Sequence, residues 1–376
     1  MKTKSHVDPR IGIVGGQAVL EGVMMKSGDK CSLAVRTPDG KIAVDNSTFT
    51  SLRKKHKFFA LPLIRGIVSF VEQLKLSMDM LTKSAEMQGI DTEQPETKFE
   101  KWLCDKFGNK LMSVVTGIGM VLGLAIGVVM FLMLPTFAAK GLDFLSGGFI
   151  GTSHFLRALV EGLIRIGVFV GYIALTSLMP DMRRTYEYHG AEHKSVACFE
   201  KGLPLTPENA ATCTRFHPRC GTSFMFVMLI ISIIVNSFLT WDNVWLRFGL
   251  KILTIPVIVG LGFEFIRYAG SHNNLFVKIL SAPGLWMQRI TTREPDEEQL
   301  AVAIEALMSC LPDEFPEHAA AQAAAKSNAE SDTESDAEAS NDDADESSNN
   351  ANIADENADT TGDTNAEGDS PKGTDA

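Results

Sequence analysis

The sequence of 376 residues lacks charge in two long stretches, and it lacks aromatic residues in a third. Residues 111–134 and 221–241 contain no Asp, Glu, Lys or Arg. Residues 318–376 contain no Phe, Trp or Tyr, and they hold 16 Asp or Glu residues against two Lys. The net charge of −11 therefore belongs to the tail, because the preceding residues carry 30 acids and 33 bases. Without the tail, the chain is too apolar for an ordinary soluble enzyme or a nucleic-acid binder.

The acidic tail, which we place at residues 312–376, consists largely of Ala, Asp, Asn, Ser and Thr. Such a composition buries too little apolar surface to offset the conformational entropy that ordering costs. The sequence therefore predicts a disordered tail.

Four apolar stretches of the chain are long enough to cross a membrane. The hydrocarbon core of a bilayer takes about 20 apolar residues of helix. The stretches are residues 111–134, 155–179, 221–241 and 252–268. The sequence therefore predicts a mainly α-helical membrane protein with about four transmembrane helices and the lipid bilayer as a partner.

Two of these stretches carry charged residues inside them. Arg157, Glu161 and Arg165 are spaced by four residues, which places them on one helix face and predicts that the acid pairs with the bases. Glu264 lies in the last stretch, where a carboxylate is costly and usually has a function. Pairing within the helix is favoured over a transport path, because Glu264 is the only other acid in the four stretches.

Basic residues are concentrated before the first stretch, after the second and after the fourth. The two opposite loops hold only Lys140, Arg247 and Lys251. Because cytoplasmic loops are enriched in Lys and Arg, we expect a multi-pass protein of the cell membrane, with both termini and the loop 180–220 in the cytoplasm. We expect no secretory signal peptide, since Gly and Glu interrupt residues 11–25.

Cysteine is scarce, with six residues in the chain. On the expected topology all six face the reducing side of the membrane, where disulfides are rare. Free thiols or metal ligands are therefore favoured over a disulfide framework.

The segments outside the membrane show local patterns. Residues 32–45 alternate apolar and polar side chains around Pro38-Asp39-Gly40, which predicts a β-hairpin. Residues 11–25 are rich in Gly and predict strands or tight loops. Apolar residues at helical spacing predict an amphipathic helix over residues 62–81, on the membrane surface or against the helix bundle.

A last helix is predicted after the fourth stretch, opened by Pro295 and three acids and running to about residue 311. Its apolar positions Leu300, Ile304 and Leu307 form a packing stripe. The expected order is a cytoplasmic hairpin segment, an amphipathic segment, the membrane bundle, a cytoplasmic helix and the tail. The corresponding ranges are residues 1–57, 58–110, 111–294, 295–311 and 312–376.

The loop 180–220 holds the pattern His189-Gly-Ala-Glu192-His193. On a helix the two histidines lie one turn apart on the same face and can bind one metal ion. Glu192 adjoins the second histidine and is placed to act as a general base towards a water molecule beside the ion. The order H-x-x-E-H is that of the inverzincins. The sequence therefore predicts a divalent metal site, with zinc as the favoured ion.

A zinc site needs a third ligand. His217 and Glu264 are favoured equally, because His217 follows closely in sequence and Glu264 is an intramembrane acid. Further candidates are Cys198, Glu200, Glu208 and Cys220. A structural role stays open, in which the histidines bond nearby carboxylates or join Cys213 and Cys220 around a structural zinc ion.

Several unusual strings occur in order along the chain: GGQAVLEGVMM at 15–25, RG at 65–66, YHGAEHK at 188–194, LTPEN at 205–209, HPRCGTSF at 217–224, EFIR at 264–267 and SAPGLWMQRITTREP at 281–295. Together they resemble the YqhQ-like family of bacterial membrane proteins. The resemblance implies an integral membrane protein of unknown function, labelled a predicted metal-dependent enzyme, with a suspected metal site at the two histidines. It implies neither a substrate nor a reaction.

The first functional hypothesis is a membrane-embedded zinc hydrolase acting on a protein or peptide at the cytoplasmic surface. Glu192 activates water, Arg219 or Arg184 steadies the developing oxyanion, and residues 15–25, with Glu21, fold over the site. The second hypothesis is a non-catalytic scaffold or assembly factor. The third is a transporter that uses Glu161 and Glu264. The sequence does not set the oligomeric state.

Overall fold

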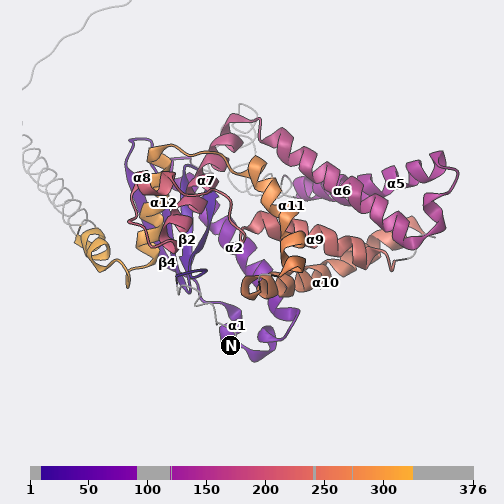
Figure 1. The fold of residues 1–376 in the computed structure, drawn as a ribbon, viewed down its shortest axis with the longest axis horizontal. Helices are drawn as coiled ribbons and strands as arrows, with labels where there is room; N and C mark the ends of the chain where they lie inside the picture. Colours follow the sequence, from indigo (N-terminus) through magenta and orange to yellow (C-terminus); the bar gives the residue numbers. More distant parts are fainter. Residues whose placement is uncertain (1–9, 91–118, 120, 240–242, 273, 325–376) are drawn as a thin grey trace, which may run out of the picture. The chain divides into compact units, whose positions relative to one another are not determined.

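The structure, a computed structural model, describes residues 10–90, 119, 121–239, 243–272 and 274–324 (Figure 1). Residues up to Phe315 belong to one compact unit. The second unit begins at Pro316, and its described part, residues 316–324, is helical. The rest of the predicted disordered tail lies outside the described residues.

The described N-terminal residues form a four-stranded antiparallel sheet in the order β1-β2-β3-β4. The strands are β1 (Gly15–Val19), β2 (Gly22–Ser27), β3 (Lys30–Arg36) and β4 (Ile42–Thr48). The predicted hairpin is confirmed, since Arg36 pairs with Ile42 across the turn that contains Pro38-Asp39-Gly40. Gly40 has φ +82°, a conformation that favours glycine. The strands expected within residues 11–25 are also present.

Helices pack on both faces of this sheet. Val23 and Met25 of β2 share a core with α7 (Pro180–Glu200) and α12 (Glu297–Cys310), whereas Met24 lies in a second core with α2 (Ile64–Met87). Successive strand residues point to opposite faces, so the uninterrupted apolar run in β2 is explained by burial on both sides. In Figure 1, β2 and β4 lie beside α12, and β2 also contacts α7.

The predicted C-terminal helix is confirmed as α12. Its N-cap Asp296 and Gln299 form a capping box, in which each side chain bonds the other residue's backbone. The predicted stripe Leu300, Ile304 and Leu307 is buried in the core with α7 and the sheet.

Three described helical stretches are long and apolar enough to cross a membrane: Val121–Leu145, His154–Thr176 and Trp245–Ala269. The first includes the π-helical turn η2 (Val129–Met133) and α5 (Leu134–Leu145). The second is α6 (His154–Thr176), and the third lies in α10 (Val244–Ser271). α9 (Gly221–Asn236) is apolar but shorter.

These bounds revise the four predicted stretches. Much of residues 111–120 lies outside the described part, and the first helix continues to Leu145 because it takes up Pro135 directly after the π-helical turn. α9 ends at Asn236, five residues before the predicted end. α10 begins eight residues before the predicted start, since Arg247 and Lys251, predicted to lie in a loop, are helical and buried.

The apolar helices meet the sheet region through close glycine contacts. A Cβ on Gly66 of α2 would lie 2.8 Å from Cβ of Phe263 in α10, and one on Gly284 of α11 (Leu275–Thr291) would lie 2.5 Å from Cα of Ser223 in α9. The predicted amphipathic helix thus packs against the apolar helices and the sheet. The remaining short helices are α1 (Leu52–Lys55), η1 (Lys57–Ala60), η3 (Ile150–Thr152) and α8 (Pro207–Ala211).

Candidate metal centre

Helix α7 carries the histidine motif. Most of the segment predicted as the loop 180–220 is this helix, which starts at Pro180 in a position where proline is favoured. The rings of His189 and His193, one turn apart, have centroids 4.5 Å apart. The expectation that the two imidazoles share one helix face is therefore met.

Each imidazole is oriented by a backbone carbonyl on a different segment. His189 Nδ1 lies 2.8 Å from the carbonyl oxygen of Thr291, and His193 Nδ1 lies 2.5 Å from that of Arg215. A carbonyl oxygen only accepts hydrogen bonds, so each Nδ1 carries the proton and donates it. Each Nε2 therefore keeps its lone pair, as in histidines that bind metals.

Cys220 supplies the third converging donor. Its Sγ lies 3.3 Å from His189 Nε2. The ligand atoms of His189, His193 and Cys220 all lie within 4.8 Å of one another, and among the described residues this is the group of His, Cys and acidic side chains that converges in this way. Cys220 is also the N-cap of α9.

The two ligands favoured from the sequence lie elsewhere. Glu264 of α10 is paired with Arg65 of α2, whose Nε donates to Glu264 Oε1 over 2.6 Å. The His217 ring lies 5.6 Å from that of His193, but its Nε2 faces Glu200 at 3.6 Å and Arg219 at 3.3 Å. The ion pair with Arg65 holds Glu264, and the contacts with Glu200 and Arg219 hold His217, outside the converging group.

Glu192 lies beside this group in a buried position. One of its carboxylate oxygens is 4.0 Å from His189 Nε2. Burial raises the pKa of Glu192, against the opposing influence of His189, His217 and the backbone N–H of Gly16. A carboxyl group in this state can hold and release a proton nearer neutral pH than an exposed one can.

The strand β1 covers Glu192, in agreement with the expectation that residues 15–25 fold over the site. A Cβ on Gly16 would lie 2.4 Å from the carbonyl oxygen of Met24 and 3.2 Å from Cγ of Glu192. Only glycine allows this approach, so the Gly-rich segment is explained by close packing over the motif.

The two arginines predicted to steady an oxyanion are both held by acids. Arg219 pairs with Glu200, and Arg184 pairs with Glu21, with Nη2 of Arg184 2.6 Å from Oε2. Burial by itself would raise the pKa of Glu200, but bonds from His217 and the Gly12 N–H and the charge of Arg219 lower it to about 2. Both arginines are therefore held in ion pairs beside the site.

The other cysteines and acids suggested as ligands lie apart from the converging group. Cys198 is buried, its thiol donates to the Pro204 carbonyl over 3.5 Å, and burial and Cys213 raise its pKa to about 11. Glu208 lies in the first turn of α8. The described cysteines are all free thiols, as expected, while Cys104 lies outside the described residues.

Two supports of the site were missed from the sequence. Gln288 of α11 is buried and holds the backbone of His217 at both ends, accepting from its N–H and donating to its carbonyl, each over 2.8 Å. Thr291, three residues later, supplies the carbonyl that orients His189. Both fall in the string 281–295 that carried the family resemblance, which was the available signal.

A family model described as "Protein of unknown function (DUF1385)" matches residues 61–313. The chain belongs to this family. It is 34% identical over 311 residues to "Uncharacterized protein YqhQ" of Bacillus subtilis (strain 168), a match that covers 79% of this chain and 92% of the relative. No solved structure matches the chain. The resemblance inferred from the sequence is thereby confirmed.

The donor set in this DUF1385 chain fits a divalent ion. Two imidazole nitrogens and one thiolate are ligands that zinc accepts, and a site with three protein ligands leaves a position open. The Nδ1 bonds of both histidines fix the tautomer such a site requires, and they exist without any ion. His189, His193 and Cys220 would hold the ion.

Proposed function

We propose that this chain is a multi-pass membrane protein with a zinc-dependent hydrolase centre at His189, His193 and Cys220, acting on a protein or peptide at the cytoplasmic surface. The observation that carries the proposal is the pair of Nδ1–H bonds to the Thr291 and Arg215 carbonyls, which turn both Nε2 atoms towards the same thiol. Structural cores that merely satisfy buried histidines have no need to aim two lone pairs at one sulfur.

A zinc ion bound by these ligands would supply a Lewis acid that polarises a carbonyl group and makes water acidic. Glu192 is placed to accept the proton of that water and to pass it to a leaving amine, because it is buried and 4.0 Å from His189 Nε2. The β1 strand over Glu192 excludes bulk water from this proton transfer.

The placement at the membrane follows from chain order. α6 ends at Thr176 and α7 begins at Pro180, so the histidine helix starts at the end of an apolar helix. Basic residues cluster in this part of the chain, which favours the cytoplasmic side. A hydrolase centre in this position would cut substrates close to the bilayer surface.

The metal centre is tested by metal analysis of the untagged, full-length protein, using inductively coupled plasma mass spectrometry. We expect one zinc ion per chain, lost in His189→Ala, His193→Ala and Cys220→Ala. His217→Ala serves as the matched control and should retain the ion. Metal-free wild-type protein, or full retention by the double variant His189→Ala/His193→Ala, would refute the site.

The catalytic role is separated from a structural zinc site by Glu192→Gln. The burial of Cys220 and His193 where α7 meets α9 favours the structural alternative. On our proposal, Glu192→Gln folds and keeps its zinc but fails to complement any phenotype of a gene deletion. If it complements fully while His193→Ala loses the fold, the centre is structural and the protein is a scaffold.

A further inference from the structure

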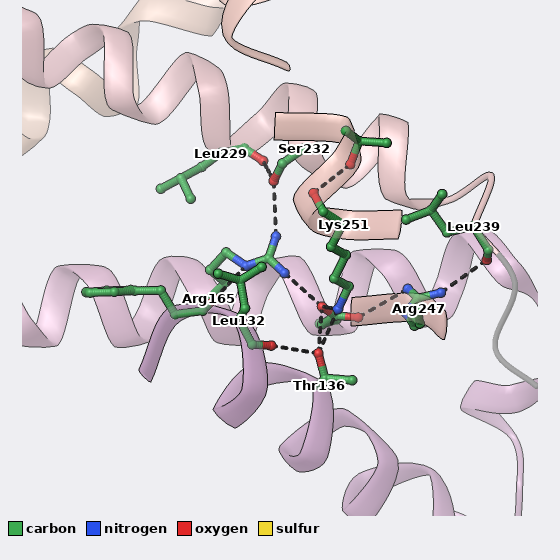
Figure 2. A network of polar contacts seen from close by, with 11 residues as sticks. Leu132, Thr136, Arg165, Leu229, Ser232, Leu239, Arg247 and Lys251 are labelled. Atoms are coloured by element: carbon green, nitrogen blue, oxygen red, sulfur yellow. Dashed lines mark hydrogen bonds and ion pairs between the residues drawn. The ribbon is translucent and has the colours of Figure 1, made fainter. Parts of the chain in front are cut away.

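A second polar cluster lies among the apolar helices and is centred on Glu161 of α6, whose ion-pair partners Arg165, Arg247 and Lys251 are labelled in Figure 2. Arg165 reaches the carboxylate from the same helix over 2.8 Å, which confirms the predicted pairing of Glu161 with this one of the two bases. Arg247 of α10 contributes a second ion pair over 3.2 Å, and Lys251 of α10 a third. Glu161 is 2% exposed, and Lys251 is equally buried.

The cluster holds more positive than negative charge. Arg165 and Lys251 alone outnumber Glu161, which in addition accepts from Arg247. Their other described partners are neutral: Arg165 donates to Ser232 over 3.2 Å, and Lys251 to Thr136 over 2.6 Å. Because a buried charge is costly unless an opposite charge accompanies it, the cluster fits an additional anion.

A cavity of about 410 Å³ adjoins this excess charge. Arg165, Lys251, Ser232 and Asn236 line it together with apolar side chains from η2, α6, α9 and α10. Asn236 is 6% exposed, and its Oδ1 has no hydrogen-bond partner among the described residues. An amide oxygen in this state can accept a hydrogen bond from a hydroxyl group of a ligand.

The cavity is polar at one end and apolar at the other. On α6, Arg165 is followed one and two turns later by Phe169 and Ile173. On α10, Lys251 is followed in the same way by Ile255 and Val259.

The third wall, α9, runs antiparallel to α6. Ser232 meets Arg165, whereas Phe226 meets Phe169 at a ring separation of 5.9 Å. Its apolar lining residues Met225 and Leu229 therefore precede its polar ones, and they lie at the same end as the apolar residues of α6. This one-way gradient matches a molecule with a charged head and an apolar tail.

The depth of the charges suits a lipid headgroup. Glu161 and Lys251 are each the eighth residue of their helix. At 1.5 Å per residue, they lie roughly 10 Å from the helix starts. Arg165 lies one turn deeper, but its guanidinium reaches back to Glu161. A headgroup at this level therefore lies in the half of the bilayer where α6 and α10 start, while its tail runs towards the bilayer centre.

We propose that this cavity binds one anionic lipid, with its phosphate at Arg165 and Lys251, a headgroup hydroxyl donating to Asn236 Oδ1, and its acyl chain along the apolar walls of α6, α9 and α10. The guanidinium group of Arg165 and the ammonium group of Lys251 are both suited to binding phosphate oxygens. The lipid site rests on the proposed membrane insertion but not on the metal centre. A failed metal test therefore leaves it intact, and a failed lipid test leaves the zinc centre intact.

The test is native mass spectrometry of the full-length chain, equilibrated in neutral detergent with equal amounts of phosphatidylglycerol and phosphatidylcholine. We expect one retained phosphatidylglycerol, preferred at least tenfold over phosphatidylcholine. Ile255→Trp, which fills the apolar part of the cavity, should abolish retention. The matched control Leu253→Trp changes a side chain that is 72% exposed on the same helix and should retain the lipid.

The headgroup contacts are tested by Lys251→Gln and Asn236→Leu, with thermal unfolding as a check on folding. Each variant should weaken phosphatidylglycerol retention at least tenfold. If Lys251→Gln does not fold, Asn236→Leu still tests the headgroup contacts. Equal retention by Ile255→Trp and wild type, absence of headgroup preference, or displacement by millimolar inorganic phosphate alone would overturn the proposal. A retained peptide in place of lipid would overturn it as well.

Discussion

The two buried polar clusters described above differ in the charge of their side chains and in the helices that supply them. Between α7 and the start of α9, His189, His193 and Cys220 present lone pairs with a carboxyl group beside them. Between α6 and α10, one carboxylate faces several cations. On our proposals, the first cluster binds a cation and the second binds an anion. Burial by itself therefore says little about a polar cluster until its charge is counted.

The largest expected effect comes from removing the acid at the centre of the second cluster. Glu161→Gln leaves Arg165 and Lys251 buried without their carboxylate. Breaking a buried pair by deleting one partner costs about 3–5 kcal/mol. We expect a loss of this size in the free energy of unfolding, measured by denaturant titration in detergent.

The same variant sharpens the contrast between the clusters. Phosphatidylglycerol should raise the melting temperature of Glu161→Gln more than that of wild type, because the added anion takes over part of the lost compensation. Added zinc should not do so. A rise with zinc and none with anionic lipid would contradict the assignment of opposite ligands to the two clusters.

The next prediction concerns the lid of the first cluster. Gly16→Ala would place a methyl group 2.4 Å from the Met24 carbonyl and 3.2 Å from Glu192 Cγ. Overpacking of this kind costs about 1–3 kcal/mol. We expect lower thermal stability and loss of function in a complementation assay, with zinc retained, because Glu192 moves and the ligands do not.

Its matched control is the neighbouring glycine. A Cβ on Gly15 would meet nothing within 4 Å. Gly15→Ala should therefore leave the melting temperature and complementation near those of wild type. If both alanine variants behave alike, close packing over Glu192 is not what the Gly-rich segment provides.

Acid titration tests the interactions of Glu200 beside the proposed metal centre. The folded-state pKa of Glu200 is lowered from 4.5 to about 2, so its stabilisation is fully present above pH 4.5 and is lost as the pH falls towards 2. The loss amounts to about 2 kcal/mol, since one pKa unit is about 1.4 kcal/mol and the site is partly solvated. Glu200→Gln should flatten the stability curve in this pH window, measured by denaturant unfolding at successive pH values.

The sequence predicts those features that depend on neighbours along the chain. The hairpin at Pro38-Asp39-Gly40, the capped helix α12 and the shared face of His189 and His193 all follow from local spacing, and the structure has them. Turn geometry, helix caps and helical periodicity act over a few residues. They therefore need no knowledge of the fold.

Features that join distant segments could not be derived in this way. Cys220 becomes the third donor because it caps α9 where α9 packs on α11. Hydropathy placed Arg247 in a loop because the partner that makes its burial tolerable, Glu161, lies 86 residues away on another helix. Whether such a charged residue lies in a loop or is buried between helices depends on contacts with distant parts of the chain.

The smallest expected effect tests whether burial determines how much an ion pair contributes to stability. Lys30 and Asp313 form an ion pair at 2.5 Å, shorter than most pairs in the Glu161 cluster, but the Asp313 side chain is 87% exposed. Exposed pairs contribute about 0–1 kcal/mol, because water screens them and two long side chains lose freedom. Asp313→Asn should therefore change the free energy of unfolding by less than about 1 kcal/mol in the titration used for Glu161→Gln. A loss as large as that of Glu161→Gln would mean that ion pairing as such, and not the uncompensated charge left between buried helices, sets the stability of the second cluster.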